Sequence, residues 1–329
     1  MYASTVLIGA LLMQGAAPVS PGGSAPPPQL SAPAPGSSAM VYIRFEGAKT
    51  AKPAPFELVK GAVVLKMQVA GKDVWALLDS GAGRSIIDEG FAREAGLTSA
   101  PSGIVLVTPT GKMAARQILQ APVAVPGNFD VVLPRVASAD LGAMSRWTGR
   151  KIDFVFGADL MKGMVVAINM PAKAMRLAPS GTIKGKPDAF VLPLSGEATA
   201  LTALSVDGKP LSLQIDLGSN AQLVLTPQAW DRLGEAGKQV GTSTSTHADG
   251  AVVETVVGML PRVSAGDREI QDVEVRVRPW PTADGAVGMG LLSRYWTVIL
   301  DLQQRKLWLI DRPAPAGPAP ATPAAEPKS

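Results

Sequence analysis

The chain has 329 residues, no cysteine, a single histidine (His247) and a formal charge of +4 that is spread without basic runs. The missing cysteine excludes disulfides, thiol catalysis and thiolate metal sites, and one histidine excludes a histidine-clustered metal centre. The small, dispersed charge argues against nucleic acid as a partner. If this chain is a hydrolase, carboxylates must do the chemistry, and we expect neither a metal nor a cofactor.

Both ends of the chain are predicted to lie outside the folded part. Residues 1–17 contain an apolar run too short to span a bilayer as a helix, followed by small residues of the kind signal peptidase accepts. We predict a signal peptide there, with an uncleaved membrane anchor as the alternative because no Lys or Arg precedes the run. Residues 18–40 and 313–329 are a Pro/Ala/Ser-rich linker and a Pro/Ala-rich tail with too few hydrophobic residues to order themselves. A secreted chain without cysteine favours a periplasmic or secreted protein of the bacterial envelope.

One short pattern occurs twice. Asp79-Ser80-Gly81-Ala82 follows a strand-like apolar run at residues 74–78. Asp216-Leu217-Gly218-Ser219 follows another such run at residues 211–215. Each motif leads through apolar residues into a predicted short helix, at residues 89–95 and 227–233, with Asp88 and Thr226 as N-caps.

A second matched pair of segments lies downstream of the first, at nearly equal separations. Gly157 ends an apolar run that begins at Phe154, and Gly288 ends a similar run that begins at Ala286. Each glycine is followed by a predicted pair of strands. Because two features recur in the same order, they indicate a duplication. We predict an N-terminal lobe at residues 41–183 and a C-terminal lobe at residues 184–312.

Between these landmarks the sequence is typical of β-structure. Short alternating strands flank turn residues, and two predicted hairpins have Gly111 and Gly250 at their tips. The predicted fold class is therefore all-β, with two related, closed-barrel-like lobes and short helices.

These motifs resemble those of the retropepsin-like aspartic proteases, and the chain resembles both halves of such an enzyme in one polypeptide, as in the pepsin-like enzymes. The resemblance covers about residues 56–310. It implies that Asp79 and Asp216 are the catalytic pair, that the hairpins are flaps, and that the apolar-Gly segments support the site. The loop residues implied as support for the pair are Ser80, Gly81, Gly218 and Ser219. The implied activity is that of an aspartic endopeptidase, a monomer that hydrolyses envelope or secreted polypeptides through a water activated by the two aspartates.

Leu217 departs from the family pattern, which has Thr or Ser at this position to hydrogen-bond across to the other loop. We therefore expect a looser site, and Leu217→Thr is expected to be neutral or slightly stabilising. Two alternatives remain open: a degenerate, peptide-binding pseudoprotease, and a secreted β-rich binding module without a catalytic pair.

Two further side chains are given roles. The Ser219 hydroxyl is predicted to donate to the outer oxygen of Asp216, which would leave more of the negative charge on Asp216. Asp159 is interpreted as a solvated turn or a local hydrogen-bond acceptor, with a third carboxylate near the site as the alternative.

Overall fold

The computed structural model describes residues 5–7, 42–46, 52–108, 111–196, 199–234, 237–247 and 250–313. The predicted signal segment, linker and tail lie outside these ranges, except for residues 5–7 and residue 313. Within the described ranges, none of the helices has both the length and the apolar character needed to cross a membrane.

The first lobe is a closed β-barrel. Its strands are β4 (Ala62–Val69), β5 (Lys72–Leu78), β6 (Ile86–Asp88), β8 (Gly111–Val125), β9 (Phe129–Ala139) and β10 (Phe154–Phe156). They pair in the order β4-β5-β10-β6-β9-β8, and β8 pairs back to β4. Outside the ring, β2 (Ile43–Phe45) pairs with β9, β3 (Ala54–Val59) with β4, and β7 (Ser99–Thr108) with β8. The helices of this lobe are α1 (Glu89–Glu94) and α2 (Gly142–Thr148).

The second lobe repeats this ring. Its strands are β14 (Leu201–Val206), β15 (Lys209–Asp216), β16 (Leu223–Leu225), β18 (Val252–Ala265), β19 (Arg268–Val277) and β20 (Gly285–Gly288). They pair in the order β14-β15-β20-β16-β19-β18, and β18 pairs back to β14. β17 (Lys238–His247) forms a hairpin with β18, and β1 (Thr5–Leu7) lies parallel to the end of β17. Helix α4 (Pro227–Leu233) matches α1.

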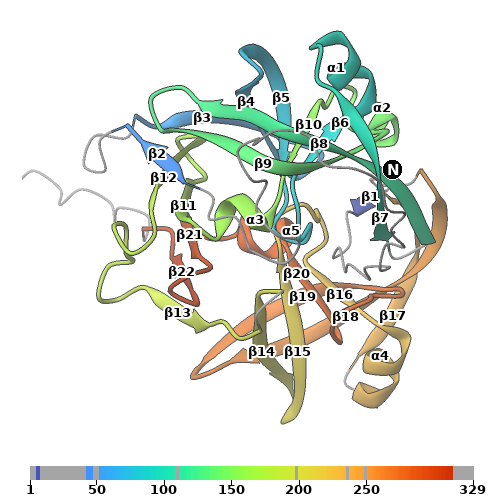
Figure 1. Ribbon diagram of the computed structural model, residues 1–329. Helices are drawn as coiled ribbons and strands as arrows, with labels where there is room; N and C mark the ends of the chain where they lie inside the picture. The colour runs from blue at the N-terminus through green and yellow to red at the C-terminus, as the bar shows by residue number, and fades with distance from the viewer. Residues whose placement is uncertain are drawn as a thin grey trace, which may run out of the picture.

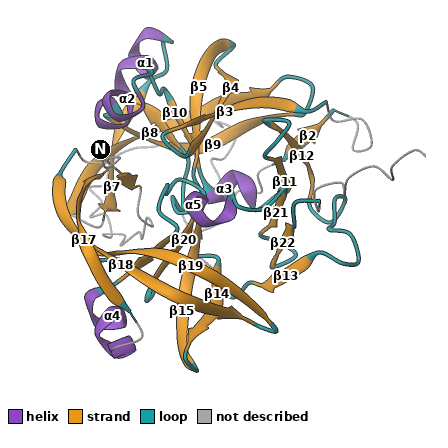
Figure 2. Ribbon diagram, turned by 180° about the vertical axis from the view of Figure 1, so that it is seen from behind, coloured by secondary structure: helices purple, strands orange, loops and turns teal. Residues whose placement is uncertain are grey.

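A sheet shared by both lobes joins them. Its strands are β11 (Met164–Asn169), β12 (Ala174–Pro179), β13 (Phe190–Pro193), β21 (Thr297–Asp301) and β22 (Lys306–Ile310). β11 of the first repeat pairs antiparallel with β21 of the second. The short helices α3 (Ala158–Met161) and α5 (Met289–Leu292) lie side by side between the lobes (Figures 1 and 2).

The sequence explains these elements in simple terms. Asp88 and Thr226 cap α1 and α4 by accepting from the backbone N–H groups of Phe91 and Ala229. The strands bury Val, Leu, Ile and Phe in a core that runs through both lobes, and each fully buried side chain of this size contributes about 1.5–3 kcal/mol. The predicted all-β, two-lobed fold is confirmed. The predicted division at residues 183 and 184 falls between β12 and β13, and the lobe boundaries stay a prediction.

Candidate active site

The two predicted catalytic aspartates lie at the same place in each lobe. Asp79 follows the last residue of β5, and Asp216 is the last residue of β15. β5 is flanked by the parallel strand β10, and β15 by the parallel strand β20. Strands β6 and β16 complete the same loop arrangement by pairing antiparallel with β10 and β20. Both carboxylates are 0% exposed.

The two aspartate loops pack directly against each other. A Cβ atom placed on Gly81 would lie 2.6 Å from Cγ of Asp216, and one placed on Gly218 would lie 2.5 Å from Cγ of Asp79. No residue with a side chain fits either position, because such distances are far shorter than van der Waals contact. The glycine of each motif thus lets the carboxylate of the other motif approach, and the structure brings the predicted pair together.

Each carboxylate is held by its own loop through one oxygen. The N–H of Ala82 donates to Oδ1 of Asp79 at 2.9 Å, and the N–H of Gly218 donates to Oδ1 of Asp216 at 2.9 Å. Among the described residues, Oδ2 of each aspartate has no hydrogen-bond partner, although both atoms are buried. Buried carboxylate oxygens without a donor are costly, which is typical of functional sites.

The surroundings shift the pKa values of the two carboxyl groups to different extents. Burial raises the pKa of Asp79 well above its ordinary value, and the charge of Asp216 raises it further. Burial also raises the pKa of Asp216, to about 6, but the neighbouring carboxyl group of Asp79, the Gly218 amide and the charge of Arg278 hold it lower. Two close carboxylates share one proton because like charges cannot both ionise cheaply. The directions of these two pKa shifts favour the proton on Asp79 and the charge on Asp216.

Ser80 forms half of the cross-lobe lock implied by the family resemblance. Its hydroxyl donates to the carbonyl of Ile215 at 2.8 Å and accepts from the N–H of Leu217 at 3.0 Å. The side chain of Leu217 is 0% exposed and belongs to the main core, so it cannot return these bonds. The loops meet as expected, with one hydroxyl in place of two.

Gln214 supplies a second cross-lobe connection that the sequence did not indicate. Its Nε2 donates to the carbonyl of Gly81 at 3.2 Å. Its Oε1 accepts from Nε1 of Trp280 at 3.0 Å and from Oγ1 of Thr282 at 2.9 Å. The first repeat has Leu77 at the matching place. The polar Gln214 in this buried strand was therefore the one signal in the sequence that could have indicated this contact.

The predicted hydrogen bond from the Ser219 hydroxyl to Asp216 is wrong. The Ser219 hydroxyl accepts from the N–H of Ala221 at 3.3 Å, and its own N–H donates to the main-chain carbonyl of Asp216. The loop turns so that the hydroxyl faces the following backbone amide instead of the carboxylate. The expected excess of charge on Asp216 stays a prediction. Asp79, the Gly218 amide and Arg278, and not the Ser219 hydroxyl, hold the pKa of Asp216 lower.

Asp159 is a local hydrogen-bond acceptor, which is one of the roles that the sequence suggested for it. Its Oδ1 accepts from the N–H and the hydroxyl of Ser85, at 2.8 and 2.7 Å, and from the N–H of Leu160 at 2.9 Å. The Ser85 hydroxyl in turn accepts from the N–H of Gly157 at 3.1 Å. Burial raises the pKa of Asp159. This carboxylate ties the Gly157 segment to the first aspartate loop.

The two predicted hairpins are present and lie on the same side of the molecule (Figures 1 and 2). Gly111 is the first residue of β8, and its N–H donates to the hydroxyl of Thr108. Gly250 has a φ of +84°, and a Cβ on it would lie 3.5 Å from Cβ of Ala143 in α2. The second hairpin therefore reaches the first lobe. The remaining tip residues, 109–110 and 248–249, lie outside the described ranges.

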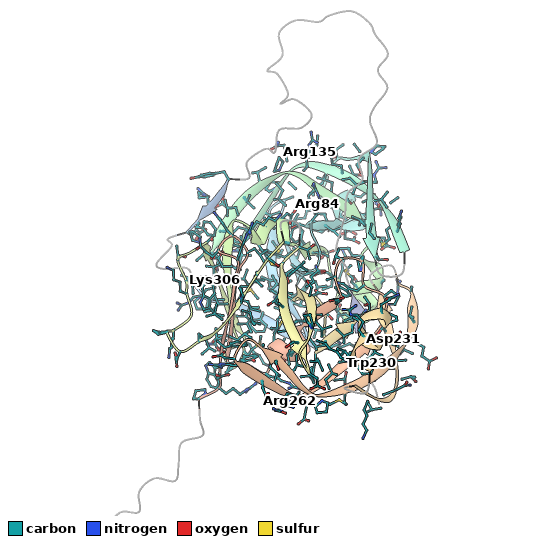
Figure 3. The ribbon with its side chains drawn as sticks, turned by 90° about the horizontal axis from the view of Figure 1, so that it is seen from below. Arg84, Arg135, Trp230, Asp231, Arg262 and Lys306 are labelled. Atoms are coloured by element: carbon teal, nitrogen blue, oxygen red, sulfur yellow. The ribbon has the colours of Figure 1, made fainter. Side chains whose placement is uncertain are left out.

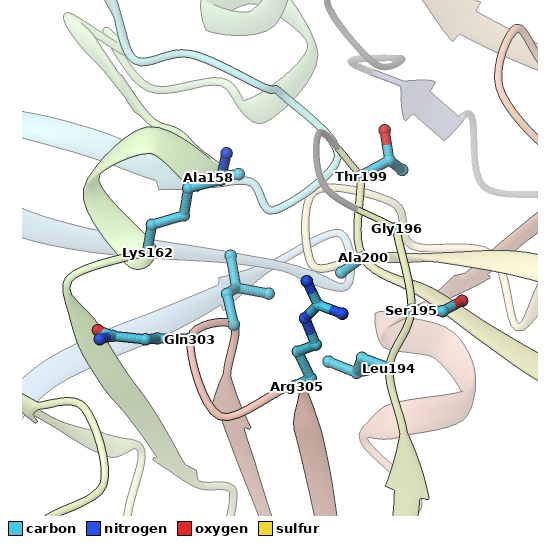
Figure 4. Close-up of a pocket in the computed structure, with 10 residues that line it drawn as sticks. Ala158, Lys162, Leu194, Ser195, Gly196, Thr199, Ala200, Gln303 and Arg305 are labelled. Carbon is cyan, nitrogen blue, oxygen red and sulfur yellow. The ribbon is translucent and has the colours of Figure 1, made fainter. Parts of the chain in front are cut away.

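A pocket of about 340 Å³ lies between α3, residues 194–196 and 199–200, and the turn that joins β21 to β22 (Figure 4). Its lining includes Lys162 and Arg305 but neither Asp79 nor Asp216. In the part of the chain that the structure describes, no group of three or more His, Asp or Glu side chains is arranged to hold a metal ion.

Comparison with known proteins agrees with this geometry. A family model described as aspartyl protease matches residues 65–160 and 202–295, which together make up more than half of the chain and fall one on each repeat. The chain belongs to the aspartyl protease family. Among solved structures, the chain is similar to a retropepsin-like aspartic protease from Rickettsia conorii. That likeness covers 37% of this chain and 89% of the other, at 18% identity and a TM-score of 0.29. A search of curated proteins finds no match.

Proposed function

We propose that the protein is an aspartic endopeptidase that cleaves peptide bonds with a water activated by Asp79 and Asp216. The observation that carries this proposal is the pair of buried carboxylates, each lying against the glycine of the opposite loop. Their raised pKa values suit a pair that holds one proton near neutral or mildly acidic pH.

In this mechanism the two carboxyl groups have different roles. The ionised Asp216 takes a proton from the water, whose oxygen attacks the peptide carbonyl carbon, while Asp79 donates its proton to the carbonyl oxygen. The resulting diol collapses as the C–N bond breaks. The leaving nitrogen takes the proton from Asp216, and Asp79 regains one from the diol. The two Oδ2 atoms, which have no hydrogen-bond partner in the described part of the chain, are the atoms available for these transfers.

A pseudoprotease is the second candidate, because Leu217 removes one hydroxyl from the cross-lobe lock. Losing one such hydrogen bond costs about 1 kcal/mol, which is small beside the 8 kcal/mol or more of a typical catalytic effect. The bond from Gln214 to the Gly81 carbonyl supplies another link between the same loops. These two facts favour the endopeptidase.

The setting of the reaction is also proposed. The apolar segment and small residues at positions 1–17 support a periplasmic or secreted enzyme, with envelope or secreted polypeptides as substrates. One chain supplies both aspartates, so we propose that the monomer is the active form.

Digestion of a random peptide library, followed by mass spectrometry at several pH values, tests the proposal. We expect internal cleavage by the wild-type protein and cleavage that is about 10²- to 10⁴-fold slower in Asp79→Asn or Asp216→Asn. Peptide binding without cleavage would favour the pseudoprotease. Neither binding nor cleavage would favour a module that acts on other ligands.

A further inference from the structure

Arg278 is a buried arginine of the second lobe. It follows β19, and its backbone N–H donates to the carbonyl of Leu225 at 2.9 Å, at the end of β16. The residue is 2% exposed, yet Nε, Nη1 and Nη2 of its guanidinium have no hydrogen-bond partner among the described residues. A buried arginine normally satisfies these donors with carboxylates or carbonyl groups.

Asp216 is the acidic group whose charge acts on Arg278. Each charge shifts the pKa of the other group toward its ionised form, although burial lowers the pKa of Arg278 and raises that of Asp216. No hydrogen bond or ion pair joins the two side chains in the described part of the chain. Trp280 and Gln214 link Arg278 to the strand that ends at Asp216, while the donors of the guanidinium itself stay unused.

The chain holds Arg278 in this position. Its guanidinium lies 5.6 Å from the ring centroid of Trp280, a cation–π contact. Nε1 of Trp280 donates to Gln214, which in turn donates to the carbonyl of Gly81 in the first aspartate loop. Arg276, near the end of β19, differs in that its Nε pairs with Glu274 at 3.2 Å, although its Nη1 is also without a partner among the described residues. The unused donors of Arg278 therefore do not result from a freely moving side chain.

An unpaired, desolvated cation destabilises the fold and persists only where something compensates it. A carboxylate is the group whose two oxygens match the planar fork of a guanidinium. We propose that Arg278 determines specificity by binding a carboxylate of the substrate beside the aspartate pair, either an Asp or Glu side chain or the free C-terminus. This inference rests on the proposed peptidase function.

The test compares matched substrates on the full chain. For a peptide that the library identifies, Gln is exchanged for Glu at each position around the cleaved bond, and each peptide is made with a free and an amidated C-terminus. We expect the wild-type protein to prefer the acidic peptide by about 10- to 100-fold in kcat/KM at one position. Preference at an internal position assigns the carboxylate to a side chain, whereas preference for the free acid assigns it to the C-terminus.

The decisive variant is Arg278→Met, which keeps the length of an apolar stem but removes the charge. It should abolish the preference while still cleaving the neutral peptide. The loss of charge also acts on Asp216, but that effect is common to both peptides and cancels in their ratio. Arg262→Met is the matched control, because Arg262 lies on β18 at the outer surface of the same lobe with a side chain that is 56% exposed (Figure 3). It should leave the preference unchanged.

A binding experiment separates failure of this inference from failure of the proposed function. Calorimetry on Asp79→Asn measures the affinity of the acidic and neutral peptides without cleavage. If the wild-type protein cleaves nothing, but the acidic peptide binds more tightly and Arg278→Met on this background removes the difference, the inference holds and the peptidase proposal fails. Equal cleavage and equal binding of the two peptides would overturn the inference. If Arg278→Met does not fold, Arg278→Lys must reduce the preference, and an unchanged preference would overturn the inference.

Discussion

At the scale of single residues, the carboxyl groups of Asp79 and Asp216 carry the clearest prediction. Asp79→Asn or Asp216→Asn should each lower kcat/KM by about 10²- to 10⁴-fold, because neither group alone can both accept and donate a proton. The fold should survive, since an amide is nearly isosteric with a carboxylate. Peptide hydrolysis and circular dichroism measure the two effects. Full activity in either folded variant would contradict the assignment.

The same burial makes folding stability depend on pH. The pKa of Asp79 is raised in the folded protein by burial and by the charge of Asp216. The carboxyl group therefore ionises at lower pH in the unfolded chain than in the folded protein. As the pH rises above the unfolded pKa of about 3.9, the free energy of unfolding decreases. The loss grows until the pH passes the folded pKa, at about 1.4 kcal/mol for each unit of the shift.

Asp79→Asn should therefore be more stable than the wild-type protein at pH 7, and the difference should shrink toward pH 4. Urea unfolding at both pH values measures it. Asp73→Asn is the matched control, because that carboxylate is exposed in the strand just before Asp79. A wild-type protein at least as stable as Asp79→Asn at pH 7 would show that Asp79 is not strained by its surroundings.

Leu217 changes one expectation drawn from the sequence. Its side chain is fully buried in the main core, so Leu217→Thr removes buried apolar volume as well as adding a hydroxyl. We now expect a net loss of about 1–2 kcal/mol, since truncating a buried leucine costs more than one hydrogen bond returns. Thermal unfolding of the variant measures this, with Leu58→Thr on an exposed position of β3 as the control. Equal or higher stability would mean that the hydroxyl compensates in full.

The repeat in the sequence was enough to predict the aspartates and their glycines as the candidate site, and the structure brings them together. The sequence did not identify Gln214, which looks like an ordinary polar residue in a strand, or Arg278, which continues an alternation of Val and Arg that is typical of a surface strand. The direction of the Ser219 hydroxyl depends on a side-chain rotamer and a loop turn. Such features follow from tertiary contacts and leave no pattern in the chain.

At the scale of elements, the two hairpins were predictable and their contacts were not. Alternating strands around Gly111 and Gly250 correctly indicated β7–β8 and β17–β18. The approach of the second hairpin to Ala143 could not be read from the sequence, because it depends on how the lobes face each other. The predicted helices at residues 89–95 and 227–233 also match α1 and α4, since caps are local signals.

The hairpins should close over a bound peptide. Hydrogen exchange with a non-cleavable peptide analogue should show increased protection in both β7–β8 and β17–β18, because backbone amides at the tips become buried. The turn between β21 and β22, on the joining sheet, serves as the internal control. Protection in one hairpin alone would mean that only one lobe has a working flap.

At the scale of the whole molecule, the duplication predicted two lobes but not how they are joined. The pairing of β11 with β21 and the bond from Gln214 to Gly81 are contacts between residues far apart in sequence. Repeats indicate that two units are alike, and they contain no information on the differences between the units. The Gln214 link is such a difference, because the first repeat has Leu77 in its place.

The last prediction concerns that link. Gln214→Leu copies the first repeat and leaves Trp280, Thr282 and the Gly81 carbonyl without their partner. We expect a loss of about 2–3 kcal/mol in the free energy of unfolding and a lower kcat, because the first loop is no longer fixed to the second lobe. Loosening should also admit water to the aspartate pair. Burial raises the pKa of Asp216, so water entry should lower it and move the acidic limb of kcat/KM to lower pH.

Gln222→Leu is the matched control for this experiment. Gln222 accepts from the N–H of Glu274 and from Arg294, all within the second lobe. The Gln222→Leu variant should also lose free energy of unfolding because hydrogen bonds are removed, but the acidic limb of its kcat/KM profile should stay in place. Chemical unfolding and pH profiles of kcat/KM for the two variants separate a general loss of stability from a loosened cross-lobe contact. An acidic limb that stays in place in Gln214→Leu, or moves equally in Gln222→Leu, would show that Gln214 only stabilises its own lobe.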